Sequence, residues 1–482
     1  MPFSPLDVVV LIAYLGGVIA LGTWMGRAQR SAKDYFLAGH NVPWWVIMLS
    51  VVATETSALT FISIPATAYT GSFWMLQLAA GYLIGRILVA VILLPGYFRG
   101  EFSTAYALLE GRFGMATRRF ASSIFMVTRA FADSVRIFAA AIPLALITGW
   151  PYWQVILLVG AATLVYTWYG GLKAVVWVDV VQMALYAVGG LAALWVLSVL
   201  VPGGWSQIAA EAGAAGRFQV VHLEGGPGQA TWLLTGLVGG AFLTMATHGV
   251  DHLTVQRLLA ASDLAGARKA MIGSGIVVFV QFTLFLLVGA GLYVFYAARD
   301  FATPDEVFPL FIIESLPAGL SGLLVAGILA AAMSTVSSSL NSLAASATHD
   351  IYAPLAKRQG DEAHLLRVGR TFTLVWAGIL IGGAILFRFA EAGTPIVVIA
   401  LQIASFTFGP LLGGFLLGTL FRAPDQRDAI IGIGTAVVLM TALWVSQTFG
   451  LIDRVADTLW FALIGSALTV AVGLASNAIR RP

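Results

Sequence analysis

The 482-residue chain contains no cysteine and few charged residues. The absence of cysteine excludes disulfide bonds, thiolate zinc sites, iron–sulfur clusters and cysteine nucleophiles. Only 10% of the residues are charged, against roughly 25% in a typical soluble domain. Hydrophobic residues make up 59% of the chain, so the composition predicts an all-α polytopic membrane protein. The net charge of +3 comes from basic residues scattered among loops, which argues against a nucleic-acid partner.

Thirteen stretches are apolar and long enough to cross a bilayer, whose core needs about 20 residues per helix. They cover approximately residues 5–25, 43–70, 73–97, 118–148, 152–170, 174–201, 230–251, 269–298, 318–350, 367–388, 395–421, 428–448 and 456–478. With the N-terminus outside and the C-terminus inside, 19 of the 26 Lys and Arg residues lie on the cytoplasmic side, as the positive-inside rule requires. The sequence therefore predicts this orientation.

The second span is interrupted by a polar run from Ala53 to Thr60, which includes Glu55. Polar residues at bilayer depth are costly and mark functional sites. A helix that unwinds in this run would expose free carbonyl groups to a cavity. The alternative is an unbroken helix whose polar face packs against neighbouring helices.

The ninth span is rich in hydroxyl groups. Ala331, Ser334, Thr335 and Ser338 are spaced i, i+3, i+4 and i+7, so they share one helix face. Hydroxyl and carbonyl oxygens can replace the water shell of a monovalent cation such as Na⁺. The alternative is that these small residues only allow close helix packing.

The sixth span carries Asp179 about one and a half turns into the membrane. A carboxylate at this depth is expected to be protonated or neutralised by a cation. A second Na⁺ would neutralise it, and so would a basic residue from the cytoplasmic rim.

The fourth span places Arg129, Asp133 and Arg136 on one face. Asp133 can neutralise one guanidinium, which leaves the other Arg for a bidentate carboxylate. The alternative is a structural Arg-Asp-Arg ladder that partners Glu55. Arg86, alone in the third span, is expected to be a helix-packing partner.

Three motifs in the same order resemble those of the sodium:solute symporters, and the similarity covers essentially the whole chain. The motifs are Gly170 to Trp177 with Asp179 and Gln182, then Asp251 with Val255-Gln256-Arg257, and then Ser334-Thr335 through Leu340-Asn341-Ser342 to Asp350-Ile351-Tyr352. The resemblance implies sodium-coupled symport and a LeuT-type fold with 5+5 inverted repeats and binding sites at discontinuous helices.

The domain organisation follows from that resemblance. Residues 1–42 would form an extra N-terminal helix and a cytoplasmic loop, and residues 202–229 an external loop. Residues 43–201 and 230–421 would form the two repeats, and residues 422–482 two C-terminal helices. The polar interruption of the second span would have a counterpart near Gly239-Gly240 and Thr244 to Gly249.

The resemblance also implies binding residues. One Na⁺ would bind at positions matching Ala53, Thr56, Ala331, Ser334 and Thr335, and a second at positions matching Asp179, Ser334, Ser337 and Ser338. The solute would contact Ser57, Thr60, Gln77, Arg129, Arg136, Phe242, Thr244, Thr247 and Gln402. The chain departs from many relatives at His252, where they have Gln. The carboxylate-binding Arg of some members aligns with Ala132, so the helix face carries over and the residue does not.

The sequence thus predicts a symporter in the inner membrane of a bacterium, not an enzyme, that moves Na⁺ and a small polar organic solute into the cell by alternating access. The solute is expected to carry a carboxylate, as sialic acid does, or to be a sugar; an amino acid, a vitamin or another neutral solute is the alternative. Beyond Na⁺, the solute and the bilayer, no obligatory protein partner is expected. A zinc enzyme built on His248, Asp251 and His252, and an uncoupled channel or sensor, are the rivals from other classes.

Overall fold

The computed structural model describes residues 4–100, 102–387, 396–453 and 455–480; for residues 28, 59, 143, 146, 147 and 396–405 it describes only the backbone. Within these residues the fold is built from helices, with a single isolated bridge between Val42 and Ala261. The helices are α1 (Pro5–Met25), η1 (Gly26–Ala28), α2 (Ala32–Leu37), η2 (Ala38–His40), α3 (Trp44–Glu55), α4 (Ala58–Thr70), α5 (Met75–Leu88), η3 (Val89–Leu93), α6 (Leu94–Tyr97), α7 (Ala107–Phe113), α8 (Met115–Thr148), α9 (Tyr152–Leu200), α10 (Gly204–Ala214), η4 (Thr235–Gly239), α11 (Gly240–Gly249), α12 (His252–Leu259), α13 (Leu264–Phe295), η5 (Pro304–Glu306), α14 (Val307–Glu314), α15 (Leu320–Ser346), η6 (Ala347–Tyr352), α16 (Ala353–Ala356), α17 (Glu362–Leu386), α18 (Ile396–Leu420), α19 (Gln426–Thr448), η8 (Thr458–Trp460) and α20 (Phe461–Arg480).

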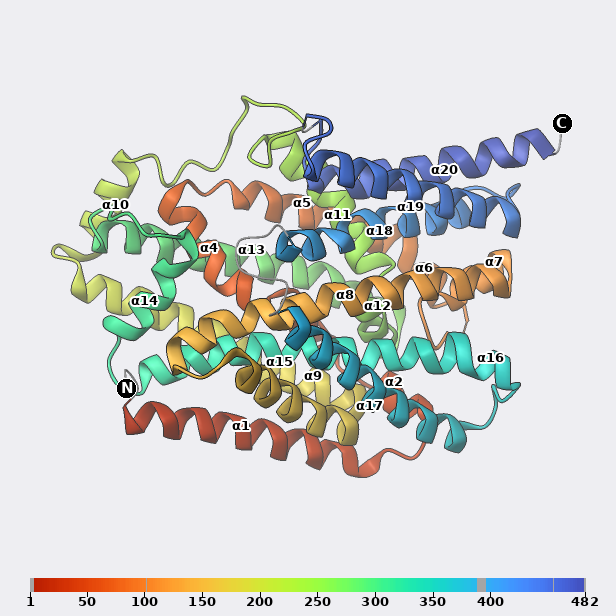
Figure 1. Cartoon of the computed structure of the whole chain (residues 1–482), viewed down its shortest axis with the longest axis horizontal. Helices are drawn as coiled ribbons and strands as arrows, with labels where there is room; N and C mark the ends of the chain where they lie inside the picture. Colours follow the sequence, from red (N-terminus) through yellow and green to blue (C-terminus); the bar gives the residue numbers. More distant parts are fainter. Residues whose placement is uncertain (1–3, 101, 388–395, 454, 481–482) are drawn as a thin grey trace.

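The long helices run along the longest axis of the molecule (Figure 1). α1 forms one edge of the bundle and α20 the opposite edge, while α10 and α14 lie at one end and α7 and α16 at the other. Among the described residues, eight helices are long and apolar enough to span a membrane, and the bent pair α3–α4 makes a ninth. The chain is therefore an integral membrane protein, as its composition predicted.

The 49-residue helix α9 contains two arms. At 1.5 Å per residue a straight helix of this length would measure about 74 Å, more than twice the bilayer core of about 30 Å. Gly171 interrupts it with φ 53° and ψ −153°, a conformation that side chains disfavour. A Cβ at this position would also lie 2.4 Å from the carbonyl oxygen of Tyr35. Glycine here therefore lets the helix break where it touches α2, between the two separate stretches that the sequence predicted.

α15 occupies the interior of the bundle. In its most apolar window, 89% of the residues are buried inside the protein, against 17% for α1. The hydroxyl-rich face predicted for this helix is consequently enclosed by other helices and does not face lipid. This burial places its polar groups where a binding site can form.

Asp7 in the first turn of α1 caps the start of α15. Its Oδ1 accepts hydrogen bonds from the backbone N–H groups of Gly319 and Gly322, at 2.7 and 2.8 Å, and from Oγ of Ser321 at 2.8 Å. The first N–H groups of a helix lack partners within the helix, and a carboxylate satisfies them while opposing the helix dipole. α1 is thereby fastened to the end of α15.

Candidate functional site

The second apolar stretch is broken where its polar run predicted. α3 ends at Glu55, α4 begins at Ala58, and the helix axes bend by 64°. Thr56 leaves the helical region with ψ 95°, and Oγ of Ser57 accepts a hydrogen bond from the N–H of Thr60 at 3.3 Å. The end of α3 therefore leaves carbonyl groups, including that of Ala53 in its last turn, free of helical partners.

The hydroxyl face of α15 packs against this break. Oγ of Ser338 lies 3.3 Å from Oγ1 of Thr54 in the last turn of α3. Thr335 donates a hydrogen bond to the carbonyl of Ala331 at 3.2 Å, and Ser337 donates to the carbonyl of Ser334 at 3.0 Å. The structure thus brings together the two elements that the sequence selected for one Na⁺.

Asp179 of α9 is fully buried and paired with a guanidinium. Nη2 of Arg257 lies 3.3 Å from Oδ2 of Asp179, and neither side chain is exposed. Ser334 donates to Oδ1 at 2.7 Å and Ser50 donates to Oδ2 at 2.5 Å. Arg257 also donates to Ser338. The carboxylate is therefore neutralised by Arg257 of α12, which corresponds to the alternative of a basic partner, although this Arg is buried rather than at a rim.

The three charged residues of α8 share one face, as their spacing predicted. Nη1 of Arg129 and Nη1 of Arg136 lie 3.3 and 3.4 Å from Oδ1 of Asp133. Nη2 of Arg129 also donates to Oδ2 of Asp251 at 2.6 Å. In the described part of the chain, the polar contact of Arg136 is the long one to Asp133, and 30% of its side chain is exposed. Arg129 is thus held between two carboxylates, whereas Arg136 keeps donors that no described residue uses.

The alternative in which this ladder partners Glu55 is wrong. Glu55 instead pairs with Arg86 of α5, whose Nη2 donates to Oε2 and lies 3.1 Å from Nε2 of His248. The side chain of Arg86 is completely buried, and that of Glu55 is 19% exposed. Arg86 is therefore the packing partner that the sequence predicted, and it packs by neutralising the carboxylate at the break.

A cavity of about 630 Å³ lies beside the break. It is large enough for a small organic molecule, because ligand pockets usually measure about 300–1,000 Å³. Four of the predicted solute contacts line it: Thr60, Arg129, Arg136 and Thr247. The other lining residues are Thr54, Glu55, Ser63, Ile64, Met75, Tyr82, Leu243, His248, Leu253, Thr254, Phe282, Asp305 and Phe408.

Two further predicted contacts come from α3–α4 and α5. Ser57 does not line the cavity. Its Oγ lies 3.1 Å from Oγ1 of Thr60, and Thr60 does line the cavity. Gln77 donates to the carbonyl of Thr231 at 2.9 Å and accepts from the N–H of His222 at 3.0 Å. Its amide therefore holds the segment that connects α10 to η4, and it does not line the cavity.

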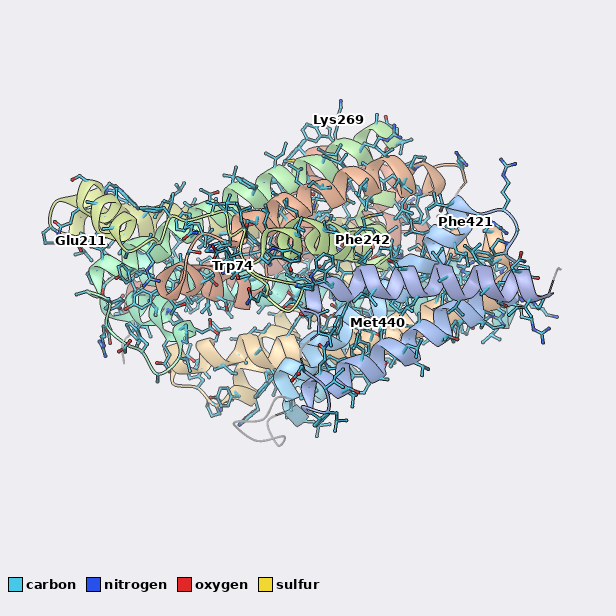
Figure 2. All side chains as sticks on the ribbon, turned by 90° about the horizontal axis from the view of Figure 1, so that it is seen from above. Trp74, Glu211, Phe242, Lys269, Phe421 and Met440 are labelled. Carbon is cyan, nitrogen blue, oxygen red and sulfur yellow. The ribbon has the colours of Figure 1, made fainter. Side chains whose placement is uncertain are left out.

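The remaining predicted contacts are on α11 and α18. Thr244 is buried, and its Cβ would lie 2.9 Å from a Cβ placed on Gly85, so it packs against α5. Phe242 packs against the apolar core, and Figure 2 shows it between Trp74 and Phe421, on the side of Trp74 away from Glu211. The side chain of Gln402 lies outside the described residues.

The two histidines proposed as zinc ligands do not share a helix face. α11 ends at Gly249 and α12 begins at His252, so their spacing is not that of one continuous helix. Nδ1 of His252 accepts a hydrogen bond from the N–H of Ala105 at 3.3 Å, while His248 lines the cavity. Burial lowers the pKa of His252 to about 3, so its ring is neutral. No group of three or more potential metal ligands occurs in the part of the chain that the structure describes.

Several residues of the cavity were missed as solute contacts in the sequence. Glu55 carried a signal, because it is a carboxylate within an apolar span. Tyr82, Phe282 and Phe408 carried none, because aromatic residues in membrane helices are more often part of the core. Asp305 comes from η5 and reaches the cavity only through the fold.

Comparisons with known proteins agree with this architecture. The family model of the sodium:solute symporter family matches residues 35–433. The sodium/sialic acid symporter NanT of Aliivibrio fischeri is 30% identical over 98% of this chain and 92% of its own length, and SiaT of Proteus mirabilis is 28% identical over 98% and 94%. A solved substrate-bound, outward-open state of a Na⁺-coupled sialic acid symporter superposes with a TM-score of 0.89 and 26% identity, covering 100% of this chain and 99% of that one.

Proposed function

Because this chain belongs to the sodium:solute symporter family and couples the transport of a solute to Na⁺, we propose that the solute is an organic carboxylate such as a sialic acid. The observation that carries the proposal is the state of Arg136. Its guanidinium lines the cavity, and among the residues that the structure describes it contacts one carboxylate, Asp133, at 3.4 Å. A guanidinium with free donors is suited to a carboxylate, which it can bind bidentately.

One Na⁺ would bind between the broken end of α3 and the hydroxyl face of α15. Carbonyl oxygens of Ala53, Thr56 and Ala331 would combine with the hydroxyls of Ser334 and Thr335. The break supports this site because it frees carbonyl groups beside α15. Such neutral oxygens can replace the water of the ion without holding it irreversibly.

A second Na⁺ would bind at Asp179 with Ser334, Ser337 and Ser338. Arg257 now neutralises this carboxylate, and it carries the same charge as Na⁺. We therefore propose that Na⁺ and the Arg257 guanidinium exchange at Asp179 during the cycle. Asp179→Asn is expected to lower the Hill coefficient for Na⁺ toward one.

The proposed cycle begins with Na⁺ joining α3 and α15 and stabilising an outward-open state. The solute then completes the cavity, and the ion leaves inward when the two helices separate. Each ion contributes roughly 2.3 kcal/mol per 100 mV and about 1.4 kcal/mol for a tenfold concentration ratio, which supports a several-hundredfold solute accumulation per ion.

The proposed topology has thirteen spans in a bacterial inner membrane, with the N-terminus outside and the C-terminus inside. Residues 43–201 and 230–421 would form inverted repeats. In support, α1 begins at the end of the molecule where α10 and α14 lie, and α20 ends at the other (Figure 1). α18 would be a span although its short described apolar part, Phe406–Leu420, is below the usual length.

The test is uptake of labelled N-acetylneuraminate into proteoliposomes with an inward Na⁺ gradient, with K⁺ or choline as the replacement. Ser334→Ala and Thr335→Ala are expected to raise the half-saturating Na⁺ concentration about tenfold, which corresponds to about 1.4 kcal/mol. Ser342→Ala is the matched control, because among the described residues this hydroxyl of α15 bonds to the carbonyl of Ser339 in its own helix and to no proposed ion ligand.

Uptake that runs equally well in K⁺ or choline would contradict sodium coupling at this site. Undiminished Na⁺ affinity in both α15 variants would contradict the assigned ion ligands. If N-acetylneuraminate is not transported, the same vesicles test a sugar and an amino acid, whose transport would favour the neutral-solute alternative over a carboxylate.

A further inference from the structure

The cavity has a negative group on its wall as well as a positive one. Glu55 lines the cavity, and Arg86 donates to its Oε2. Within the described residues no group donates a hydrogen bond to the other oxygen, Oε1. One oxygen of this carboxylate therefore keeps acceptor capacity at the cavity wall.

Arg86 fixes Glu55 as an ionised acceptor. Its side chain is fully buried, and in the described part of the chain its Nε and Nη1 have no hydrogen-bond partner. A buried guanidinium that loses its carboxylate is strongly destabilising, so Glu55 must stay charged and in place. An ionised carboxylate accepts hydrogen bonds but cannot donate one.

His248 completes the support of this carboxylate. Its Nε2 lies 3.5 Å from Oε2 of Glu55, and its Nδ1 lies 2.9 Å from Oγ1 of Thr247. Arg86 of α5 and His248 of α11 thus both contact Oε2, and these two groups fix the position of the other oxygen, Oε1. The acceptor at the cavity wall is therefore preorganised.

Charges around the cavity balance rather than add to a positive field. Arg129 and Arg136 line it together with Glu55 and Asp305, and Arg129 is already paired with two carboxylates. A simple anion bound near Arg136 would leave Oε1 of Glu55 without a hydrogen-bond donor, because Arg86 neutralises the charge of Glu55 but donates to Oε2. A solute with a carboxylate at one end and donor groups at the other would satisfy both Arg136 and Glu55.

We infer that Glu55 selects solutes that carry a hydrogen-bond donor, a hydroxyl or a protonated amine, in addition to a carboxylate. The inference rests on the proposed function, because it takes the carboxylate to bind at Arg136. A site that bonds a donor rejects an analogue without one because its own polar group is left unpaired. Propionate and iodide are therefore poor ligands, and hydroxy or amino acids are good ones.

The test compares acids that differ only in a donor, namely lactate and alanine against propionate, and gluconate against hexanoate. The purified full chain in detergent with Na⁺ is titrated with each acid, and thermal unfolding gives the half-maximal concentration, because only a bound ligand stabilises by mass action. For the wild type, the acid with the donor is expected to act at a concentration at least about tenfold lower.

The decisive variant is Glu55→Gln/Arg86→Met, which removes both charges and leaves no unpaired ion. For this variant, the ratio of half-maximal concentrations between the two acids of a pair is expected to fall to about threefold or less. If it does not fold, Glu55→Asp keeps the charge but retracts the oxygens by one methylene, and its ratio is expected to fall as well. The half-saturating Na⁺ concentration is expected to stay at the wild-type value.

If the folded variant keeps the wild-type ratio of half-maximal concentrations between the paired acids, the inference is overturned. A change in Na⁺ affinity alone also overturns it, because Glu55 would then contribute to ion binding and not to solute selection. A wild type stabilised equally by both members of every pair overturns the inference but keeps the proposed function. A wild type that no carboxylate stabilises and that shows no uptake overturns the proposed function as well.

Discussion

Two carboxylate–guanidinium pairs lie near the break in α3–α4, and they differ in whether a carboxylate oxygen is left without a hydrogen-bond donor among the described residues. Asp179 and Arg257 are both fully buried, and each oxygen of Asp179 accepts a hydrogen bond. Glu55 is partly exposed to a cavity and has one oxygen to which no described residue donates, although its partner Arg86 is as fully buried as Arg257. A sealed pair can only exchange one cation for another, whereas an open pair can recognise a solute.

The difference arises from the elements around each pair. Asp179 is surrounded by hydroxyl donors of α3 and α15, Ser50 and Ser334, so that each of its two oxygens has a donor. Glu55 is the last residue of a helix that stops, so its far side meets the cavity. If the proposals hold, the proposed ion site and the proposed solute site differ in how many carboxylate oxygens lack a donor in the described part of the chain, and burial alone does not distinguish them.

Arg257→Gln tests the sealed pair and is expected to give the largest effect. Removing one partner of a buried pair costs about 3–5 kcal/mol because the other charge is left uncompensated. In K⁺ or choline, thermal unfolding is expected to show the full loss of unfolding free energy. In Na⁺ the loss is expected to be smaller, because Na⁺ can neutralise Asp179.

The matched control for that experiment is Arg358→Gln. Its pair with Asp361 is about half exposed, and exposed pairs contribute little to stability. An Arg257→Gln protein that loses the same stability in Na⁺ as in choline would show that Na⁺ does not replace the guanidinium.

Arg136→Gln tests the positive side of the open cavity. A hydrogen bond to a charged group contributes about 1.5–3 kcal/mol, so the KM for N-acetylneuraminate uptake is expected to rise roughly 10- to 100-fold. Arg136→Lys keeps the charge but loses the bidentate geometry. Its KM is expected to lie between those of the wild type and Arg136→Gln. Equal KM values for wild type and Arg136→Gln would remove this residue from the solute site.

Thr54→Val tests the residue that connects the two regions and is expected to give the smallest effect. Thr54 lines the cavity, donates to the carbonyl of Ser50 at 2.8 Å and contacts Ser338. Loss of this hydroxyl is expected to cost about 1 kcal/mol of unfolding free energy, measured by denaturant or thermal unfolding. A loss as large as that of Arg257→Gln would mean that the two pairs do not act independently.

Features set by local sequence could be predicted. The break at Thr56, the enclosed hydroxyl face of α15 and the turn at Gly171 follow from polar, hydroxyl and glycine residues within short stretches. The common face of Arg129 and Arg136 follows from helical spacing. Each of these needs only the geometry of one helix or one turn.

Partners far apart in the sequence could not be predicted in the same way. Arg257 and Asp179 are 78 residues apart, and nothing in either stretch specifies the pairing. The choice of Arg86 rather than the α8 ladder for Glu55 depends on how α3 and α5 pack. The spacing of His248 and His252 suggested that they share one helix face. The chain leaves the helix at Val250 and Asp251 between them, so they do not.

The cap that Asp7 places on α15 has a consequence for how the protein moves. Because this carboxylate holds three donors at the start of α15, α1 cannot stay behind when that helix tilts without giving up all three bonds at once. α1 is accordingly expected to move together with α15, so a probe attached to the outer face of α1 would report the tilting of α15.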